Sequence, residues 1–452
     1  MKLIWDVRDY GAIGDGIALD TVAIQKAMDE CSESGGGTVY FPRGIYLSGT
    51  LELRSNVMLE LSATAVLLAS PHKKDYPGAG VHEDSIGNSY FLLGEGIEKF
   101  RITGQGTIDG SGPDFWTDEV INNVPNLGPI MKPKSFRPRA LLYMVDCSDI
   151  SFCDVTVRNS PCFTLWLLGC DRVNIDRVNI DNPQHGPNTD GIDIDCCSNV
   201  HISNCHISAG DDAIALKSDA KRLARKKACE NVTVTNCTFT SRACGVRIGY
   251  EGDAPIRDCC FSNIVMRNTD IGFSLVSILP NIPPKPTGIN LAEYLEISEG
   301  CQIERICISN VVMDNVNSPF YMWLGSEVDK KHLGSISGIN ISNVTALANN
   351  SCCIYGMPDN KITDITLSNI SITIKSQIYP SVSEAPYECG VWGAWGIPYA
   401  IYLQNAQRIS FRNVNVAFTK MAGDNWSGIY EADQCSDVDS RGIYSSMPND
   451  NC

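Results

Sequence analysis

Three aspartates in two short polar motifs are the strongest candidates for chemistry in this chain. Asp190 ends an Asn-Thr-Asp motif, and Asp211 and Asp212 end a Gly-Asp-Asp motif further along. Crowding like charges raises the pKa of one carboxyl group and keeps its proton near neutral pH. Glycoside hydrolysis needs such a set: a protonated carboxyl donates to the leaving oxygen, and an ionised one activates water or attacks the sugar. An isolated Asp in a turn is more often a turn former, so the interpretation depends on the fold that positions all three.

A repeated strand phrase predicts that fold. It alternates Val or Ile with Thr, Ser or Asn, which is the period-2 pattern of β-strands. A strand-only repeat with a period in the twenties, lengthened by loop insertions, is typical of a parallel β-helix. Asn tolerates the left-handed backbone at a bend, and its amide can bond to the same position one coil away. The fixed Asn of each copy is found at Asn204, Asn236, Asn263, Asn310, Asn343, Asn369 and Asn413.

Aligning the inward Ile and Val residues of three consecutive coils brings the aspartates together. In this register Asp190 stacks on Asp212, and Cys244 comes next in the same column. Neighbouring coils lie about 4.8 Å apart. Three carboxylates from two adjacent coils are therefore predicted to converge at the end of a strand.

The ends of the chain are consistent with a capped solenoid. We predict one β-helix domain over residues 1–452, with an N-terminal cap at about 1–50 and an irregular tail at about 418–452. A solenoid must cover its open core, and an amphipathic stretch with an Asp cap predicts a capping helix near 20–33. Insertions are expected to form loops that wall the binding face. They lie at 71–93, 110–138, 219–228, which is basic, and 279–300, which is rich in proline and ends in a short helical run.

The two Asp motifs resemble those of the polygalacturonase family, glycoside hydrolase family 28. The resemblance runs along nearly the whole chain, from residues 10–16 and 41–46 to the Asp motifs, which are its most specific part. It implies an all-β fold, a right-handed parallel β-helix, with Asp211 as general acid and Asp190 and Asp212 activating the water. The family inverts configuration, which fits carboxyl groups about 6.5–9.5 Å apart. Asn188, in the first motif, is expected to bind substrate.

The chain departs from the family where the substrate carboxylate would be held. The family's Gly-His-Gly motif falls on residues 243–245, where Cys244 replaces the His, and its Arg-Ile-Lys motif falls on residues 274–276, which carry neither cation. A neutral sugar such as rhamnose, or a modified uronate, therefore fits the cleaved bond better than plain galacturonate. Arg247, one coil earlier, either replaces a missing cation or is a solvated surface residue. Lys217 matches the family's Lys after the Asp pair and is predicted to bind substrate.

Further side chains are candidates for the substrate face. Tyr321 and Trp323 alternate with apolar neighbours and either stack on sugars in the groove or pack in the core. His185 precedes the first Asp motif and is a candidate to line the site. Long insertions around the groove favour exo action on short oligosaccharides. We therefore expect an exo-acting hydrolase of pectin-derived oligosaccharides, with a rhamnogalacturonan-type linkage slightly ahead of homogalacturonan.

Composition excludes several other classes of function. A net charge of −16 argues against a general nucleic-acid binder.

No apolar stretch approaches the roughly 18 residues of a membrane span. The first residues lack a signal-peptide pattern, so the sequence as written is expected to be cytoplasmic. The 20 cysteines show no zinc-site spacing. We expect no metal or cofactor, and mostly reduced core thiols.

Two alternatives from other classes stay open. A carbohydrate lyase can use the same fold with carboxylate-bound calcium and a Lys or Arg base. A catalytically inactive oligosaccharide-binding protein would fit the replacement of the family's His by Cys244, although all three Asp residues are present. In every reading the partner is an oligosaccharide, and the sequence does not indicate the oligomeric state.

Overall fold

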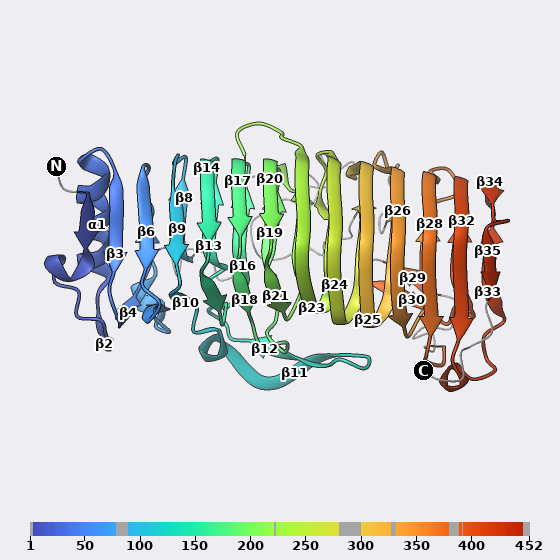
Figure 1. Cartoon of the computed structure of the whole chain (residues 1–452), viewed down its shortest axis with the longest axis horizontal. Coiled ribbons are helices and arrows are strands. Elements are labelled where there is room, and N and C mark those ends of the chain that lie inside the picture. The colour runs from blue at the N-terminus through green and yellow to red at the C-terminus, as the bar shows by residue number, and fades with distance from the viewer. Residues whose placement is uncertain are drawn as a thin grey trace. The chain divides into compact units, whose positions relative to one another are not determined.

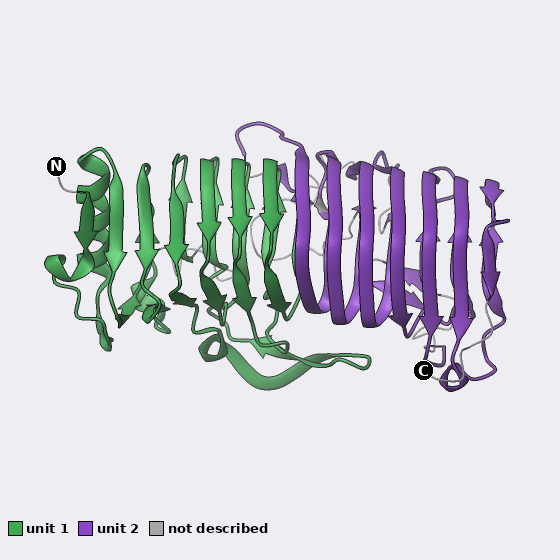
Figure 2. Cartoon of the chain, viewed as in Figure 1, with its two compact units in different colours: residues 1–214 green, residues 215–452 purple. Residues whose placement is uncertain are grey.

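The structure, a computed structural model, describes most of the chain as two compact units. They comprise Met1–Ile214 and Ala215–Cys452 (Figure 2), and each is presented by itself. The predicted single domain stays a prediction. Lys221 and Arg222 of the basic insertion and most of the proline-rich insertion, with its short helical run, lie outside the described residues. Those described are 3–77, 89–220, 223–279, 300–326, 331–378, 388–390 and 392–445.

Unit 1 is a parallel β-helix in which each strand pairs with strands one coil away (Figure 1). The first column of strands is β1 (Ile4–Asp6), β3 (Gly37–Phe41), β6 (Val57–Leu61), β9 (Arg101–Gly104), β14 (Ser148–Cys153), β17 (Asp171–Asp176) and β20 (Ser198–Ser203). The second is β2 (Asp15–Leu19), β4 (Gly44–Ser48), β7 (Ala65–Ala69), β10 (Thr107–Asp109), β15 (Thr156–Arg158), β18 (Asn179–Asp181) and β21 (His206–Ala209). The third is β5 (Leu51–Glu52), β8 (Tyr90–Glu95), β13 (Ala140–Val145), β16 (Phe163–Leu168) and β19 (Ile192–Asp195).

The predicted N-terminal helix is confirmed as α1 (Thr21–Glu33). Its apolar stripe buries Ile24, Met28 and Cys31 against the first coils. The predicted side-chain cap is wrong, because the Asp20 carboxylate instead accepts hydrogen bonds from the backbone of residues 13 and 14 at 2.7 and 3.0 Å. Within the described parts of the chain, no helix is both long and apolar enough to cross a bilayer. Single helical turns occur at η1 (Val7–Tyr10), η2 (Lys73–Asp75), η3 (Gly112–Phe115) and η5 (Lys420–Ala422).

The second predicted loop insertion of unit 1 is in fact a hairpin. Strands β11 (Trp116–Val124) and β12 (Gly128–Pro133) pair antiparallel outside the helix columns (Figure 1). Most of β11 is exposed, so it has no buried face from which alternation could be read in the sequence. Its pairing with β12 supplies the backbone hydrogen bonds instead.

Unit 2 continues the same kind of parallel pairing with longer, bent strands. It opens with the end of β22 (Ile214–Ser218). The sheet strands that follow are β23 (Cys229–Gly252), β24 (Ile256–Leu279), β25 (Gln302–Ser326), β26 (Ser335–Ala348), β28 (Ile362–Ile374), β32 (Ala406–Phe418), β34 (Ser436–Asp439) and β35 (Ile443–Ser445). A shorter column continues from β25 through β27 (Cys352–Tyr355), β31 (Tyr399–Gln404) and β33 (Gly428–Asp433). One antiparallel hairpin joins β29 (Glu388–Gly390) and β30 (Gly393–Trp395).

An asparagine ladder fixes the bend of each coil in unit 2, as the repeat predicts. Asn236, Asn263, Asn310, Asn343 and Asn369 all adopt a left-handed backbone with φ between 55° and 57°. Each amide donates to the side-chain oxygen one coil earlier at 3.1–3.2 Å along the run from 263 to 369. The ladder confirms the predicted register, and no catalytic role is needed to explain these residues.

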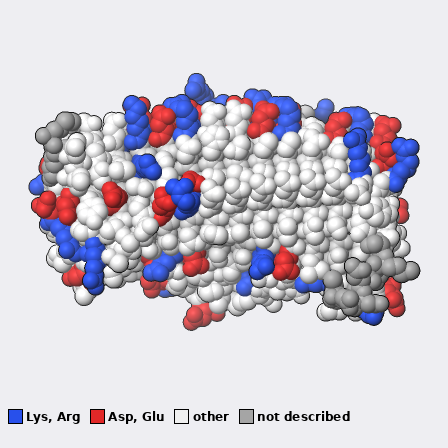
Figure 3. Space-filling view, viewed as in Figure 1, with Lys and Arg blue, Asp and Glu red and all other residues white. Residues whose placement is uncertain are grey.

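The outward residues of the unit 2 sheet form long uncharged rows (Figure 3). Positions in register on successive strands carry Thr, Cys, Asn and Ser, while the charged side chains of this face lie mainly along its edges. One such row is Thr233, Cys260, Cys307, Asn340, Thr366 and Ser410. The face shown is therefore not a basic surface of the kind that binds nucleic-acid phosphates.

The prediction of an irregular C-terminal tail is wrong for residues 428–445, and residues 446–452 lie outside the described part of the chain. Strands β33, β34 and β35 occupy residues 428–445 and pair with β31 and β32. These strands are mostly half-buried or exposed, with no fully buried residue. Their sequence therefore lacks the alternation that marks a buried strand, and pairing with the preceding coil determines their conformation.

Candidate active site

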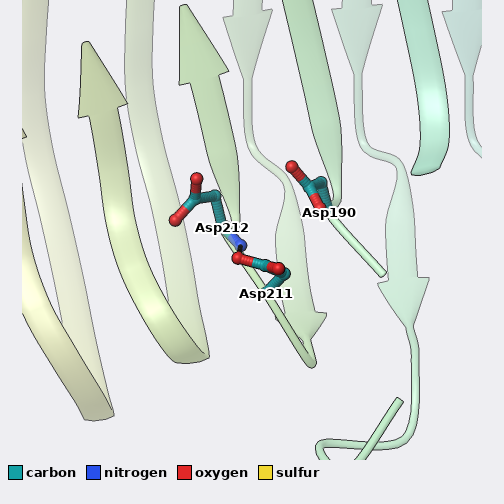
Figure 4. A group of neighbouring side chains, drawn as sticks. All are labelled: Asp190, Asp211 and Asp212. Atoms are coloured by element: carbon teal, nitrogen blue, oxygen red, sulfur yellow. Dashed lines mark hydrogen bonds between the residues drawn. The ribbon is translucent and has the colours of Figure 1, made fainter. Parts of the chain in front are cut away.

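Three carboxylates converge in unit 1 as predicted. One oxygen from each of Asp190, Asp211 and Asp212 lies within 4.8 Å of the others, and Figure 4 shows the three side chains gathered at the ends of neighbouring strands. Asp190 and Asp212 are buried, with exposed fractions of 3% and 4%, whereas Asp211 is half-buried. The cluster therefore combines two enclosed carboxylates with one more open to solvent.

Backbone hydrogen bonds fix this cluster in the predicted register. The Gly191 amide donates to the Asp212 carbonyl at 2.8 Å, and the next amide, Ile192, donates to Ala213 at 3.1 Å. This pattern sets Asp190 opposite Asp212 on adjacent coils. The stacking inferred from the sequence is confirmed.

The glycines and the threonine of the two Asp motifs allow the two coils to pack closely at the cluster. A Cβ on Gly210 would lie 2.2 Å from the Gly186 carbonyl oxygen, and one on Gly191 would lie 2.4 Å from Ala213 O. The buried Thr189 hydroxyl accepts from the Gly210 amide at 3.0 Å and donates to Gly186 at 3.1 Å. The two motifs are thus joined through backbone that only glycine allows to approach so closely.

Asn188 links the cluster to a residue that the sequence did not reveal. Its side-chain amide donates to Asp211 Oδ2 at 3.3 Å, and its backbone is left-handed with φ of 53°. Its Oδ1 accepts from the guanidinium of Arg137 at 2.7 Å, and Arg137 also donates to Pro187 O at 2.6 Å and Pro161 O at 3.3 Å. Arg137 is only 2% exposed. It therefore orients Asn188, and through Asn188 it orients Asp211.

His185 lies beside this arrangement but contacts the hairpin. Its ring meets Trp116 of β11 edge-on at 5.8 Å, and its carbonyl accepts from Met131 of β12 at 2.9 Å. The Trp116 indole in turn donates to Pro161 O at 3.1 Å, a carbonyl that Arg137 also contacts. The hairpin and the Asp cluster therefore share supporting residues within unit 1. His185 itself is exposed.

Lys217 and Arg247 belong to unit 2, and both are buried, each 4% exposed. The alternative that Arg247 is a solvated surface residue is therefore wrong. It is in register with Ser274, which precedes Tyr321, Cys353 and Tyr402 in the same column of positions. The missing family cation at residue 274 is thus flanked by Arg247 on one side and an aromatic residue on the other.

Tyr321 and Trp323 lie in the core rather than on an open face. They are 0% and 7% exposed and pack in a cluster with Cys353, Ile397 and Tyr402. The β29–β30 hairpin covers Tyr321, whose hydroxyl lies 2.5 Å from Gly390 O and 2.8 Å from Gly393 O. Sugar stacking on Tyr321 is therefore corrected to core packing, because an inserted hairpin occupies the space above the ring.

The cysteines behave as small core residues. None of the 19 cysteines in the described residues forms a disulfide, and most are buried. Cys244, which replaces the family's His, is 0% exposed in the aromatic cluster of unit 2. In unit 1 a hydrogen bond with the Cys170 thiol, together with burial, raises the pKa of Cys147 well above its usual value. Such thiols stay protonated and unreactive.

The geometry of unit 1 suits acid–base chemistry at an acetal. Glycoside hydrolysis requires a carboxyl group that donates a proton and another group that acts as base, and the cluster brings three carboxyl groups within 4.8 Å of one another. The same three oxygens could also hold a divalent ion, and calcium would then need further oxygen ligands to reach its usual 6–8. Arrangement alone permits either chemistry.

Comparison with known proteins identifies the family. Residues 31–390 match the family described as Glycosyl hydrolases family 28. A probable polygalacturonase from Vitis vinifera is 29% identical over 84% of this chain and 76% of its own length. An exo-poly-alpha-D-galacturonosidase from Dickeya chrysanthemi is 27% identical over 59% of this chain and about half of its own length (51%).

A solved structure supports the fold. The hyperthermoactive exopolygalacturonase from Thermotoga maritima superposes with a TM-score of 0.71, covering 93% of this chain and 92% of its own, at 20% identity. This similarity confirms the predicted right-handed parallel β-helix. Because the family match spans most of the sequence, the chain belongs to glycosyl hydrolase family 28 and is a glycosidase.

Proposed function

We propose that this protein is an exo-acting, inverting hydrolase of pectin-derived oligosaccharides. In the mechanism, Asp211 donates a proton to the leaving oxygen while Asp190 and Asp212 remove a proton from the attacking water. The observation that carries the proposal is the convergence of the three carboxylates within 4.8 Å on two adjacent coils.

The assignment of Asp211 as the acid rests on its surroundings. It is the more exposed member of the cluster, where a leaving sugar can depart. Asn188 donates to its Oδ2, and Arg137 holds Asn188 in place. Asp190 and Asp212 are enclosed and opposite each other, which is suited to gripping one water between them.

Relatives favour a pectic substrate and a chain-end reaction. The Vitis relative is named a polygalacturonase, and the Dickeya relative an exo-acting galacturonosidase. In its sequence, however, this chain has Ser274 where the family motif carries an arginine. We therefore propose that the sugar at the cleaved bond is neutral or a modified uronate, with rhamnogalacturonan-type fragments slightly ahead of homogalacturonan-type ones.

Inversion is proposed from the family resemblance and not from a carboxyl separation. One oxygen from each of the three aspartates lies within 4.8 Å of the others. The separation of about 6.5–9.5 Å typical of inverting enzymes is a different quantity, because it is measured between two carboxyl groups on opposite sides of the bond. The anomeric form of the first product, followed by proton NMR, measures the stereochemistry directly.

A panel of oligosaccharides tests the function. Homogalacturonan and rhamnogalacturonan fragments of defined length are incubated with the protein, and the products are identified. We expect one saturated monosaccharide to appear from the first time point, while the remaining fragment shortens by one sugar at a time. Rapid mid-chain cleavage of polygalacturonate would contradict exo action, and an unsaturated product that disappears with EDTA would show the calcium-dependent lyase. Binding of the fragments without turnover would show an inactive binding protein.

We also propose that the protein works in a reducing compartment such as the cytoplasm. The proposal rests on buried thiols such as Cys147, Cys170 and Cys197, which occupy core positions without disulfides. Thiol titration of denatured, unreduced protein is expected to find most of the 20 cysteines free. Detection of more than a few disulfides would place the protein in an oxidising compartment.

A further inference from the structure

The β29–β30 hairpin of unit 2 presents an indole to solvent at its turn. Gly390 and Gly393 form the last pair of the hairpin, and Trp392 immediately precedes Gly393. Its side chain is 57% exposed, more than that of any other Phe, Tyr or Trp among the described residues. A single exposed apolar residue is common on protein surfaces, so exposure alone assigns no role.

The hairpin that carries Trp392 is held firmly. The Tyr321 hydroxyl meets the carbonyls of Gly390 and Gly393, as described above. The Asn350 amide donates to Ala394 O at 2.8 Å, and the Ser351 hydroxyl donates to Ile397 O at 3.2 Å. Cys353 and Cys389 bring their sulfur atoms to 3.3 Å. The buried side chains of Tyr321, Asn350 and Ser351 thus hold the segment that displays the indole.

A strained residue supports one side of that indole. Tyr250 has φ of 73°, and it is the one aromatic residue with a left-handed backbone in the described part of the chain. This conformation is unfavourable for a bulky side chain and persists only where neighbouring structure imposes it. The Tyr250 and Trp392 rings lie 5.0 Å apart at an angle of 50°. The structure around Tyr250 therefore imposes a backbone conformation that places a second aromatic ring beside the exposed indole.

A buried cation completes the arrangement. The Arg247 guanidinium lies 5.6 Å from the Tyr250 ring and 5.7 Å from the Trp392 ring, within cation–π range. Burial raises the pKa of the nearby Asp270 to about 6, while a hydrogen bond from Asn317 and the charge of Arg247 act in the opposite direction. Trp392 is 57% exposed and Arg247 is 4% exposed, so the indole offers a ligand far more surface than the guanidinium does.

We propose that Trp392 is a carbohydrate-stacking residue of unit 2, which takes the apolar C–H face of a pyranose ring with Tyr250 at its side. An exposed indole face that neighbouring groups hold in place is what such a sugar face requires. The inference rests on the proposed function, since the ligand is a sugar residue of the pectin-derived oligosaccharide. The indole contacts the C–H face of the pyranose ring, so binding here does not require a carboxylate on the sugar.

Binding measurements without turnover test this role. The Asp211→Asn protein is titrated with tetragalacturonate and with a neutral galactan tetrasaccharide by calorimetry, and Trp392→Ala is added to the same background. We expect the affinity for the better-bound oligosaccharide to fall at least about tenfold, with Trp392→Phe retaining most of it. The matched control is Tyr444→Ala, an aromatic residue on β35 that is 47% exposed and bonded to Asn413. It should leave affinity unchanged.

The outcomes separate this inference from the proposed function. Because Trp392 is exposed, its replacement should leave the melting temperature nearly unchanged. Equal affinities with and without the indole, or no binding of either oligosaccharide, would overturn the stacking role. If the wild-type protein hydrolyses its substrate while Trp392→Ala binds normally, the hydrolase stands and only this inference fails.

Discussion

Asp211→Asn is expected to lower kcat by about 10²–10⁴-fold on oligosaccharides, without loss of folded structure. The substitution keeps the shape of the side chain and the contact with Asn188, but the amide cannot donate a proton to a leaving alkoxide. Asp211 is half-buried, so the exchange creates neither a cavity nor an unpaired buried charge. Initial rates on the active fragment, with circular dichroism for the fold, measure the effect.

A leaving-group comparison makes this prediction specific for acid catalysis. A nitrophenyl glycoside of the same sugar needs little protonation, so its hydrolysis by Asp211→Asn should be far less impaired. Asp149→Asn is the matched control, since Asp149 is an exposed partner of Arg172 remote in sequence from both Asp motifs. Near-full activity of Asp211→Asn on a natural oligosaccharide would show that another residue supplies the proton.

Arg137→Met is expected to lower kcat by about 10²-fold and to destabilise the fold by about 3 kcal/mol. The residue is buried and donates to Asn188 Oδ1, Pro187 O and Pro161 O. Its loss leaves Asn188 free to rotate and displaces the amide that contacts Asp211. Chemical denaturation measures the stability, and steady-state kinetics measures kcat and KM separately.

An exposed arginine provides the control for this variant. Arg172 is 53% exposed at its side chain and pairs with Asp149, so Arg172→Met should change stability by less than about 1 kcal/mol. Partial recovery of kcat in Arg137→Lys would support a positioning role, because one donor to Asn188 is restored. An Arg137→Met protein that is destabilised yet fully active would show that Arg137 serves the fold alone.

The repeat made the Asp cluster predictable from the sequence. Once the coils are aligned by their inward Ile and Val residues, the parallel pairing forces Asp190 opposite Asp212, and Asp211 follows as its neighbour. The asparagine ladder was predictable for the same reason, because a solenoid repeats one local environment at each coil. Local rules and nearest-neighbour stacking determine these features.

Segments outside the repeat were not predictable in the same way. Arg137 reaches Asn188 from a segment with no periodic pattern, 51 residues earlier in the chain. The hairpin that covers Tyr321 is likewise an insertion, so alternation could not distinguish an open aromatic from a covered one. Strands β33 to β35 form by pairing to the preceding coil although their own sequence is polar. In each instance a long-range contact overrides the local pattern.

The most direct test of the central claim is to carry out the oligosaccharide reaction in water labelled with heavy oxygen. If Asp190 and Asp212 activate water for hydrolysis, mass spectrometry should find one labelled oxygen at C1 of the fragment that carries the newly formed reducing end, and none in the leaving saccharide. The label should be absent from the rest of the product at early times. Unlabelled, unsaturated product would mean elimination, and no product from any pectic fragment would mean that the three carboxylates do not catalyse hydrolysis of these substrates.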